Sequence, residues 1–145
     1  MFDISFIGQR FPAFTLEVER AKLHEFALAI GETDPMYHSS REAQAAGYED
    51  VQMLPTAPTQ FEFWGNPGWM EHLRSIGLNT TGLLHVEQEF EYLGAIKPGD
   101  ILTGMTCVRD GKARRGLVMV TLETRYTNVH GEQMLIATMR VMVRE

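Results

Sequence analysis

The sequence contains one cysteine in 145 residues, and this scarcity limits the chemistry that the chain can carry. Cys107 alone cannot close a disulfide bond within the chain, so nothing indicates an oxidising compartment. No cluster of cysteine and histidine has the spacing of a zinc site, and we expect neither a metal nor a cofactor. Cys107 stands among apolar residues at strand-like spacing, which predicts a small buried hydrophobe.

Positive charge and long apolar runs are also scarce. The chain has 13 lysines and arginines against 19 acidic residues, a net charge of -6, and its basic residues are scattered. Such a chain is a poor candidate for binding nucleic acid. No apolar run approaches the about 20 residues that span a bilayer, and the first residues do not resemble a signal peptide. We therefore expect a cytoplasmic protein that does not bind membranes.

The balance of residue types is that of a folded chain. Hydrophobic residues make up 44% of the sequence and charged residues 22%, which is typical of globular rather than disordered proteins. No linker, repeat or low-complexity segment divides the sequence. Residues 1–145 are therefore expected to form one domain with its own core.

The first half of the sequence predicts helices. A short strand over 14–18 precedes a helix over 19–30. Gly31 follows the helix, at the position of a left-handed C-cap. The apolar face of this helix has helical spacing and consists of Leu23, Phe26, Ala27 and Ile30. A second, shorter helix is predicted over 39–46.

A third helix is predicted after Pro58. Thr59 and Glu62 have the spacing of a capping box, in which the two side chains bond to the first turn of the helix. Glycines and a proline at 65–68 must interrupt this helix, and Gly77 ends it.

The second half predicts strands, because apolar residues there recur with a period of two. Asp110-Gly111 is predicted to close a hairpin. The expected strands cover 83–93, 101–108, 117–128 and 133–143. Helices followed by long antiparallel strands indicate an α+β architecture, and an antiparallel sheet wrapped around a central helix, the hot-dog fold, fits this order.

The run G-E-T-D-P-M-Y-H, from Gly31 to His38, resembles the signature loop of the MaoC-like, R-specific enoyl-thioester hydratases. In that family the loop reads roughly G-D-x-N-P-x-H, and its Asp and His exchange protons with water and the thioester. Gly31 and Pro35 match here, whereas Glu32 stands at the Asp, Asp34 at the Asn and Tyr37 at the His.

Two further stretches carry the same resemblance. Residues 85–92, followed by the Pro98-Gly99-Asp100 turn, resemble a strand and turn of these enzymes, and residues 53–59 occupy the place of their A-H-G-M helix start. Within the family the chain is most similar to the N-terminal MaoC-like dehydratase domain. That domain includes the non-catalytic subunit of heterodimeric 3-hydroxyacyl-thioester dehydratases.

The resemblance implies four candidates for a catalytic role, which are Glu32, Asp34, Tyr37 and His85. The longer side chain of Glu32 displaces its carboxylate from the position of the Asp, and Asp34 is better explained as a turn-capping residue. An ordinary tyrosine pKa of about 10 is too high for an efficient proton shuttle. His85 either faces the substrate or pairs with a neighbouring glutamate on its strand.

The resemblance also implies a substrate-binding set of Thr56, Ala57, Phe61, Trp64 and His85. In the family a backbone N–H at the start of the central helix binds the thioester oxygen. Pro58 has no N–H, which leaves Ala57 or Thr59 as the donor. The aromatic residues of the helix, Phe63 and Trp69 included, are core residues or line an acyl tunnel. Of the other histidines, His24, His72 and His130 are predicted to lie at the surface, and His38 to pack or lie at the surface.

Three functions remain open. The first is an accessory, acyl-chain-binding subunit of an R-specific 3-hydroxyacyl-thioester dehydratase or hydratase, weak or inactive alone and paired with a catalytic MaoC-like chain. The second is a homodimeric hydratase with a variant dyad. The third is a hot-dog acyl-thioester binder or thioesterase, for which Glu62 is the only carboxylate near the central helix. The ligand in each case is a thioester of coenzyme A or of acyl carrier protein, which places the chain in fatty acid metabolism.

Overall fold

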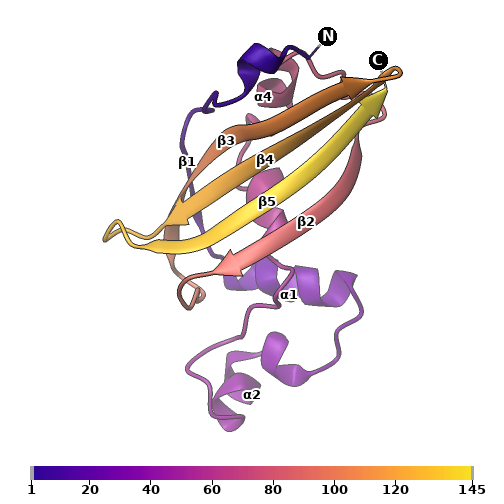
Figure 1. Ribbon diagram of the computed structural model, residues 1–145. Coiled ribbons are helices and arrows are strands. Elements are labelled where there is room, and N and C mark those ends of the chain that lie inside the picture. Colours follow the sequence, from indigo (N-terminus) through magenta and orange to yellow (C-terminus); the bar gives the residue numbers. More distant parts are fainter. Residues whose placement is uncertain (1, 145) are drawn as a thin grey trace.

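The computed structural model describes residues 2–144, in which a curved sheet and a set of helices form two layers (Figure 1). The helical elements are η1 Ile4–Phe6, α1 Arg20–Ala29, η2 Pro35–Tyr37, α2 Ser40–Ala45, α3 Thr59–Phe63 and α4 Trp69–Ser75. The strands are β1 Phe14–Glu17, β2 Leu84–Tyr92, β3 Ile101–Arg114, β4 Leu117–Thr127 and β5 Gln133–Arg144. The helices of the second layer lie on one side of the sheet (Figure 1).

Within residues 2–144 the strands form one antiparallel sheet in the order β1-β3-β4-β5-β2. The two edges differ, since β1 has four residues and β2 has nine. Alternate residues of β3, β4 and β5 are buried, because successive side chains of a strand point to opposite faces. The predicted α+β, antiparallel architecture is confirmed.

Two clusters of buried side chains join the inner face of the sheet to the helices. One packs α4 against the strands and includes Trp69, Leu73, Ile76, Val108, Leu122 and Met139. The other packs α1 and α3 and includes Leu23, Ala27, Phe61, Leu102, Tyr126 and Leu135. The chain breaks between α3 and α4 where the sequence predicts it, so one discontinuous helical layer covers both clusters. Among the described residues no helix is long and apolar enough to cross a membrane.

The position predicted for the β3–β4 hairpin turn, at Asp110-Gly111, is wrong. Strand β3 continues through both residues to Arg114, and the turn lies at Arg115–Gly116, both with positive φ, 54° and 75°. The register of the β3–β4 pair shifts between Val108 and Asp110, which marks a β-bulge. The Asp110-Gly111 dipeptide, although typical of hairpin turns, therefore pairs with β4 inside a long strand, directly after the bulge.

Two predicted apolar faces are less buried than their periodicity indicates. Ile30 lies beyond the end of α1 and is 54% exposed. Strand β2 has a register shift between His85 and Glu87, and Leu84 and Val86 are 55% and 48% exposed. The bulge breaks the strict alternation of β2, and its position at the sheet edge leaves apolar side chains in solvent.

Candidate functional site

The signature loop begins where α1 ends. Gly31 has a φ of 75°, the left-handed conformation that glycine adopts without strain and that the sequence predicts. The side chain of Glu32 turns back on the loop, and its Oε1 accepts the backbone N–H groups of Thr33 at 2.8 Å and Asp34 at 2.9 Å. The carboxylate that replaces the family's Asp is thus engaged with its own backbone.

The next residues of the loop are also held by local bonds. Asp34 Oδ1 accepts the N–H of Met36 at 3.1 Å and caps η2, so the predicted capping role is confirmed. Tyr37 is half-buried against the cluster of α1 and α3. Burial raises the pKa of the Tyr37 phenol, and the charges of Glu32 and Asp34 raise it further. At neutral pH this side chain is therefore a neutral phenol.

His38 and His24 form a pair that the sequence does not predict. The carbonyl oxygen of Glu32 can only accept, so the Nε2–H of His38 donates to it at 2.7 Å. Nδ1 of His38 lies 3.1 Å from Nδ1 of His24, and the two rings share a hydrogen bond. Both rings are half-buried and meet edge to face. The surface position predicted for His24 is wrong, and the packing alternative for His38 is confirmed.

The segment before α3 lies beside this loop. The N–H of Gln52 donates to the carbonyl of Met36 at 3.1 Å, and the Tyr92 hydroxyl of β2 donates to the carbonyl of Pro55 at 2.6 Å. These two bonds fix the start of the central helix between the loop and the edge strand.

The backbone donors at this helix start are already bonded. Pro58 is the N-cap of α3 and has no N–H. The N–H of Ala57 donates to Leu54 at 2.9 Å, and that of Thr59 donates to Thr56 at 3.2 Å. Ala57 is buried, whereas Thr56 is exposed. Both donors that the sequence left open for a thioester oxygen thus bond to internal carbonyls.

Glu62 does not form the predicted capping box. Thr59 is the first residue of α3 rather than its cap, and its hydroxyl donates to the carbonyl of Thr56 at 2.9 Å. The Glu62 side chain is fully buried, and neither carboxylate oxygen makes a well-formed hydrogen bond with residues 2–144. Burial raises the pKa of Glu62 to about 7, although the nearby Thr124 hydroxyl opposes part of the effect.

His85 lies apart from the loop. Its Nε2 is 3.0 Å from Gln88 Oε1, and its ring centroid is 6.1 Å from that of Phe63. Tyr92, which contacts the helix start, lies at the other end of β2. Seven residues of extended chain separate the two, or about 23 Å at 3.3 Å per residue. Within one chain, His85 is therefore not brought to the signature loop.

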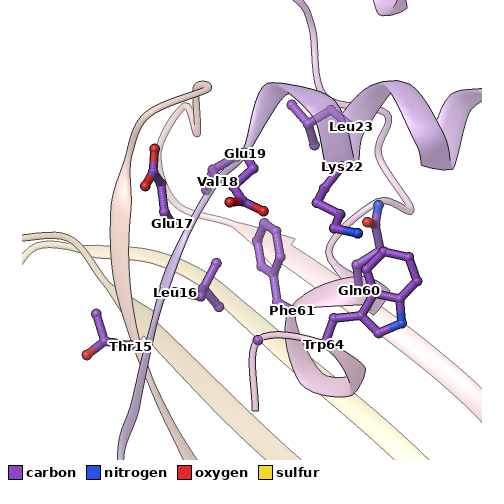
Figure 2. Close-up of a pocket in the computed structure, with 11 residues that line it drawn as sticks. Thr15, Leu16, Glu17, Val18, Glu19, Lys22, Leu23, Gln60, Phe61 and Trp64 are labelled. Atoms are coloured by element: carbon purple, nitrogen blue, oxygen red, sulfur yellow. The ribbon is translucent and has the colours of Figure 1, made fainter. Parts of the chain in front are cut away.

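Phe61 and Trp64 meet in a pocket of about 290 Å³ between β1, the start of α1 and α3 (Figure 2). Its apolar wall is formed by Leu16, Leu23 and Phe61. The ammonium of Lys22 lies 4.0 Å from the centroid of the Trp64 ring, a cation–π contact. Trp64 is 59% exposed and stands at the rim.

The structure thus divides the predicted site residues into three places. The loop and the helix start adjoin and contain Glu32, Asp34, Tyr37, Thr56 and Ala57. The pocket contains Phe61 and Trp64, and His85 stands alone on β2. Sequence reasoning missed the contribution of Leu16 and Lys22 to the pocket, because no local pattern relates them to Trp64. Among the described residues no three histidine, cysteine or acidic side chains are placed to share a metal ion.

Comparison with known proteins gives consistent matches over the whole fold. A sequence model of the FAS1-like dehydratase domain region matches residues 5–137. A UPF0336 protein from Saccharopolyspora erythraea is 34% identical over 143 residues, which cover 98% of this chain and 91% of the relative.

Solved structures share the fold. The C-terminally truncated HadBC (3R-hydroxyacyl-ACP dehydratase) complex from Mycobacterium tuberculosis gives a TM-score of 0.77 at 24% identity, over 95% of this chain and 97% of that one. A MaoC-like dehydratase from Rhodospirillum rubrum gives a TM-score of 0.62 at 24% identity, over 96% and 92% of the two chains.

The antiparallel sheet with helices on one side is the hot-dog fold, and the HadBC and MaoC-like dehydratase structures share it. The chain belongs to the family of the FAS1-like dehydratase domain region. Its general class is therefore that of dehydratase domains with a hot-dog fold.

Proposed function

We propose that the chain is the accessory, acyl-chain-binding half of an R-specific 3-hydroxyacyl-thioester dehydratase or enoyl-thioester hydratase. A second hot-dog chain supplies the catalytic pair. The observation that carries this proposal is the closed helix start, where Pro58 lacks an N–H and the N–H groups of Ala57 and Thr59 are bonded internally. The reaction needs donors for the enolate-like thioester oxygen, and this chain offers none at the position that the family uses.

The signature loop supports the same division of labour. Removal of the α-proton needs a base, and loss of the hydroxyl needs an acid. The Glu32 carboxylate accepts two backbone N–H groups, and the Tyr37 phenol has a raised pKa. Both side chains serve the loop and its packing, so the loop acts as scaffold in the assembled enzyme.

The free edge of β2 is the proposed contact with the catalytic chain. An edge strand presents unpaired N–H and C=O groups that a second sheet can bond. On β2 and directly after it, Leu84, Val86 and Leu93 are 55%, 48% and 48% exposed. Edge-to-edge pairing at β2 would cover these side chains and bring the partner against His85.

The pocket beside α3 is the proposed acyl-chain site. Its wall of Leu16, Leu23 and Phe61 is apolar, as a hydrocarbon chain requires. The thioester class follows from the family, and both coenzyme A and acyl carrier protein remain candidates for the thiol. The thioesterase alternative is disfavoured, because Glu62 is fully buried and cannot reach a substrate in the pocket or at the surface.

Substitutions in the loop test the proposal in the assembled complex. Tyr37→Phe and Glu32→Gln should each change the rate of enoyl-thioester hydration by less than about tenfold, whereas loss of a general acid or base costs 10²–10⁴ in rate. His85→Ala should have a moderate effect through the Michaelis constant, by positioning the thioester. A loss above about a hundredfold from Glu32→Gln, with an unchanged circular dichroism spectrum, would show that this loop performs chemistry.

A further inference from the structure

A second groove, of about 280 Å³, lies on the face of the sheet that points away from the helices. Its lining residues on β3 and β4, among them Met105 and Cys107, alternate with the buried residues of the same strands. The prediction that Cys107 is buried is wrong, because this residue is half-exposed and lies in the groove. The groove is therefore separate from the pocket beside α3, which lies on the helical side.

Three arginines from three segments meet in this groove. Arg10 precedes β1 and is placed by an isolated antiparallel bridge to Cys107. Arg109 and Arg125 stand on β3 and β4. Between them lies Glu123, which accepts from Arg125 Nε at 2.8 Å and pairs with Arg109 Nε at 3.2 Å.

The Glu123 carboxylate orients two guanidinium groups without neutralising the groove. Its side chain is 15% exposed, whereas those of Arg109 and Arg125 are 50% and 43% exposed. Arg10 makes no side-chain hydrogen bond or ion pair with any residue from 2 to 144. The three arginines and one carboxylate give the groove a net charge of +2, although the net charge of the whole chain is -6. Such a concentration of positive charge attracts anions to this face.

We propose that the outer-face groove binds an organic phosphate. A guanidinium group donates parallel hydrogen bonds to phosphate oxygens in a geometry that an ammonium cannot provide. Arg10 is free to make such bonds. Glu123 holds the guanidinium groups of Arg109 and Arg125 in place, and Arg125 Nη1 also donates to Gln133 Oε1 at 3.3 Å. Met105 and Cys107 give the groove an apolar floor, which suits the organic portion of the ligand rather than a phosphate ion alone.

Adenosine triphosphate is the probe for the test, with calorimetric titration of the whole chain as the measurement. The chain should bind the probe, and Arg10→Ala should weaken binding by about tenfold or more, because charge-assisted bonds are lost. Arg114→Ala is the matched control. It removes the same charge from an exposed position of β3 outside the groove, and it should bind as the unaltered chain does.

Alkylation of Cys107, the sole cysteine, locates the bound probe. Saturating probe should slow the reaction of this thiol with iodoacetamide in the unaltered chain and in Arg114→Ala, but much less in Arg10→Ala. Equal affinities of Arg10→Ala and Arg114→Ala would overturn the proposal, as would the absence of binding at millimolar probe. Protection of Cys107 by an acidic peptide but not by the nucleotide would also overturn it, in favour of a protein partner.

Discussion

At the scale of single residues, Glu62 is a carboxyl group whose environment is very different from water. Its carboxyl is fully buried between α3 and the sheet, near the Thr124 hydroxyl and the unpartnered Tyr126 hydroxyl. Desolvation disfavours the charged form, and the pKa rises from its ordinary 4.5 to about 7. The folded chain therefore holds a proton that the unfolded chain releases.

This difference makes the stability of the fold depend on pH. Because the folded pKa is raised, the contribution of Glu62 to stability is fully present below about pH 4.5 and is lost as the pH rises through about 7. Between about pH 5 and about pH 8 the free energy of unfolding should fall by about 2–3 kcal/mol from this group. Urea denaturation at the two pH values measures the fall.

Glu62→Gln keeps the shape of the side chain and removes its proton equilibrium, so most of this fall should disappear. Glu89→Gln is the control, because Glu89 is exposed on β2. This substitution should not change how the free energy of unfolding depends on pH. An equal fall in the unaltered chain and in Glu62→Gln would contradict the assignment.

Residue roles were predictable where the cause is local. The capping by Asp34 depends on the proline that follows it, and the left-handed Gly31 depends on the end of a helix. Glu62 was misassigned because Thr59-x-x-Glu62 fits a capping box only if Thr59 precedes the helix. Thr124 and Tyr126 of β4, which lie near Glu62, are distant in sequence, so no local pattern could reveal its burial.

At the scale of elements, Gly104 lets β3 pass beneath two aromatic rings. A Cβ at this position would lie 2.9 Å from Tyr126 Cε1 and even closer to the ring of Phe14. Phe14 belongs to β1 and Tyr126 to β4, and both rings pack in the cluster of α1 and α3. Gly104→Ala should therefore lower the free energy of unfolding by about 1–3 kcal/mol, the usual range for overpacking.

Gly94→Ala is a matched comparison. The added Cβ would lie 2.8 Å from Met134 Cε, the end of a flexible side chain that can move aside. Chemical denaturation should show a smaller loss for Gly94→Ala than for Gly104→Ala. The reverse order would mean that the rings of Phe14 and Tyr126 adapt more readily than the methionine.

The elements themselves were largely predictable, because helical and strand periodicity are strong signals in this sequence. The predicted helices and long strands are present, and most of their ends differ by one or two residues, whereas β3 ends six residues later than predicted. The β3–β4 turn was misplaced because Asp110-Gly111 is a typical turn dipeptide. The actual turn uses Arg115 at positive φ, a conformation that arginine rarely adopts. The strand order could not be read from the sequence, since it depends on contacts between distant segments.

At the scale of the whole molecule, the proposed contact with the catalytic chain is the free edge of β2. If β2 joins a second sheet, Val86→Lys would bury a charge at the contact, which costs at least a few kcal/mol when unpaired. The dissociation constant of the complex with a catalytic hot-dog chain, from sedimentation velocity, should rise by more than about tenfold.

Val129→Lys is the control for that experiment. Val129 is 71% exposed in the β4–β5 turn, outside strand β2, and its substitution adds the same charge. Equal dissociation constants for the two variants would place the partner on another surface. A chain that stays monomeric and unpaired at micromolar concentration would exclude the edge-to-edge arrangement altogether.

The central claim is that this chain binds the acyl group and a partner performs the proton transfers. Its most direct test is the initial rate of enoyl-thioester hydration by the chain alone, by a catalytic MaoC-like chain alone and by their mixture. The account predicts a rate near background for the chain alone. It also predicts an active mixture whose preference for acyl length differs from that of the catalytic chain and changes in Trp64→Ala. Robust turnover by the chain alone, abolished by Glu32→Gln, would contradict it.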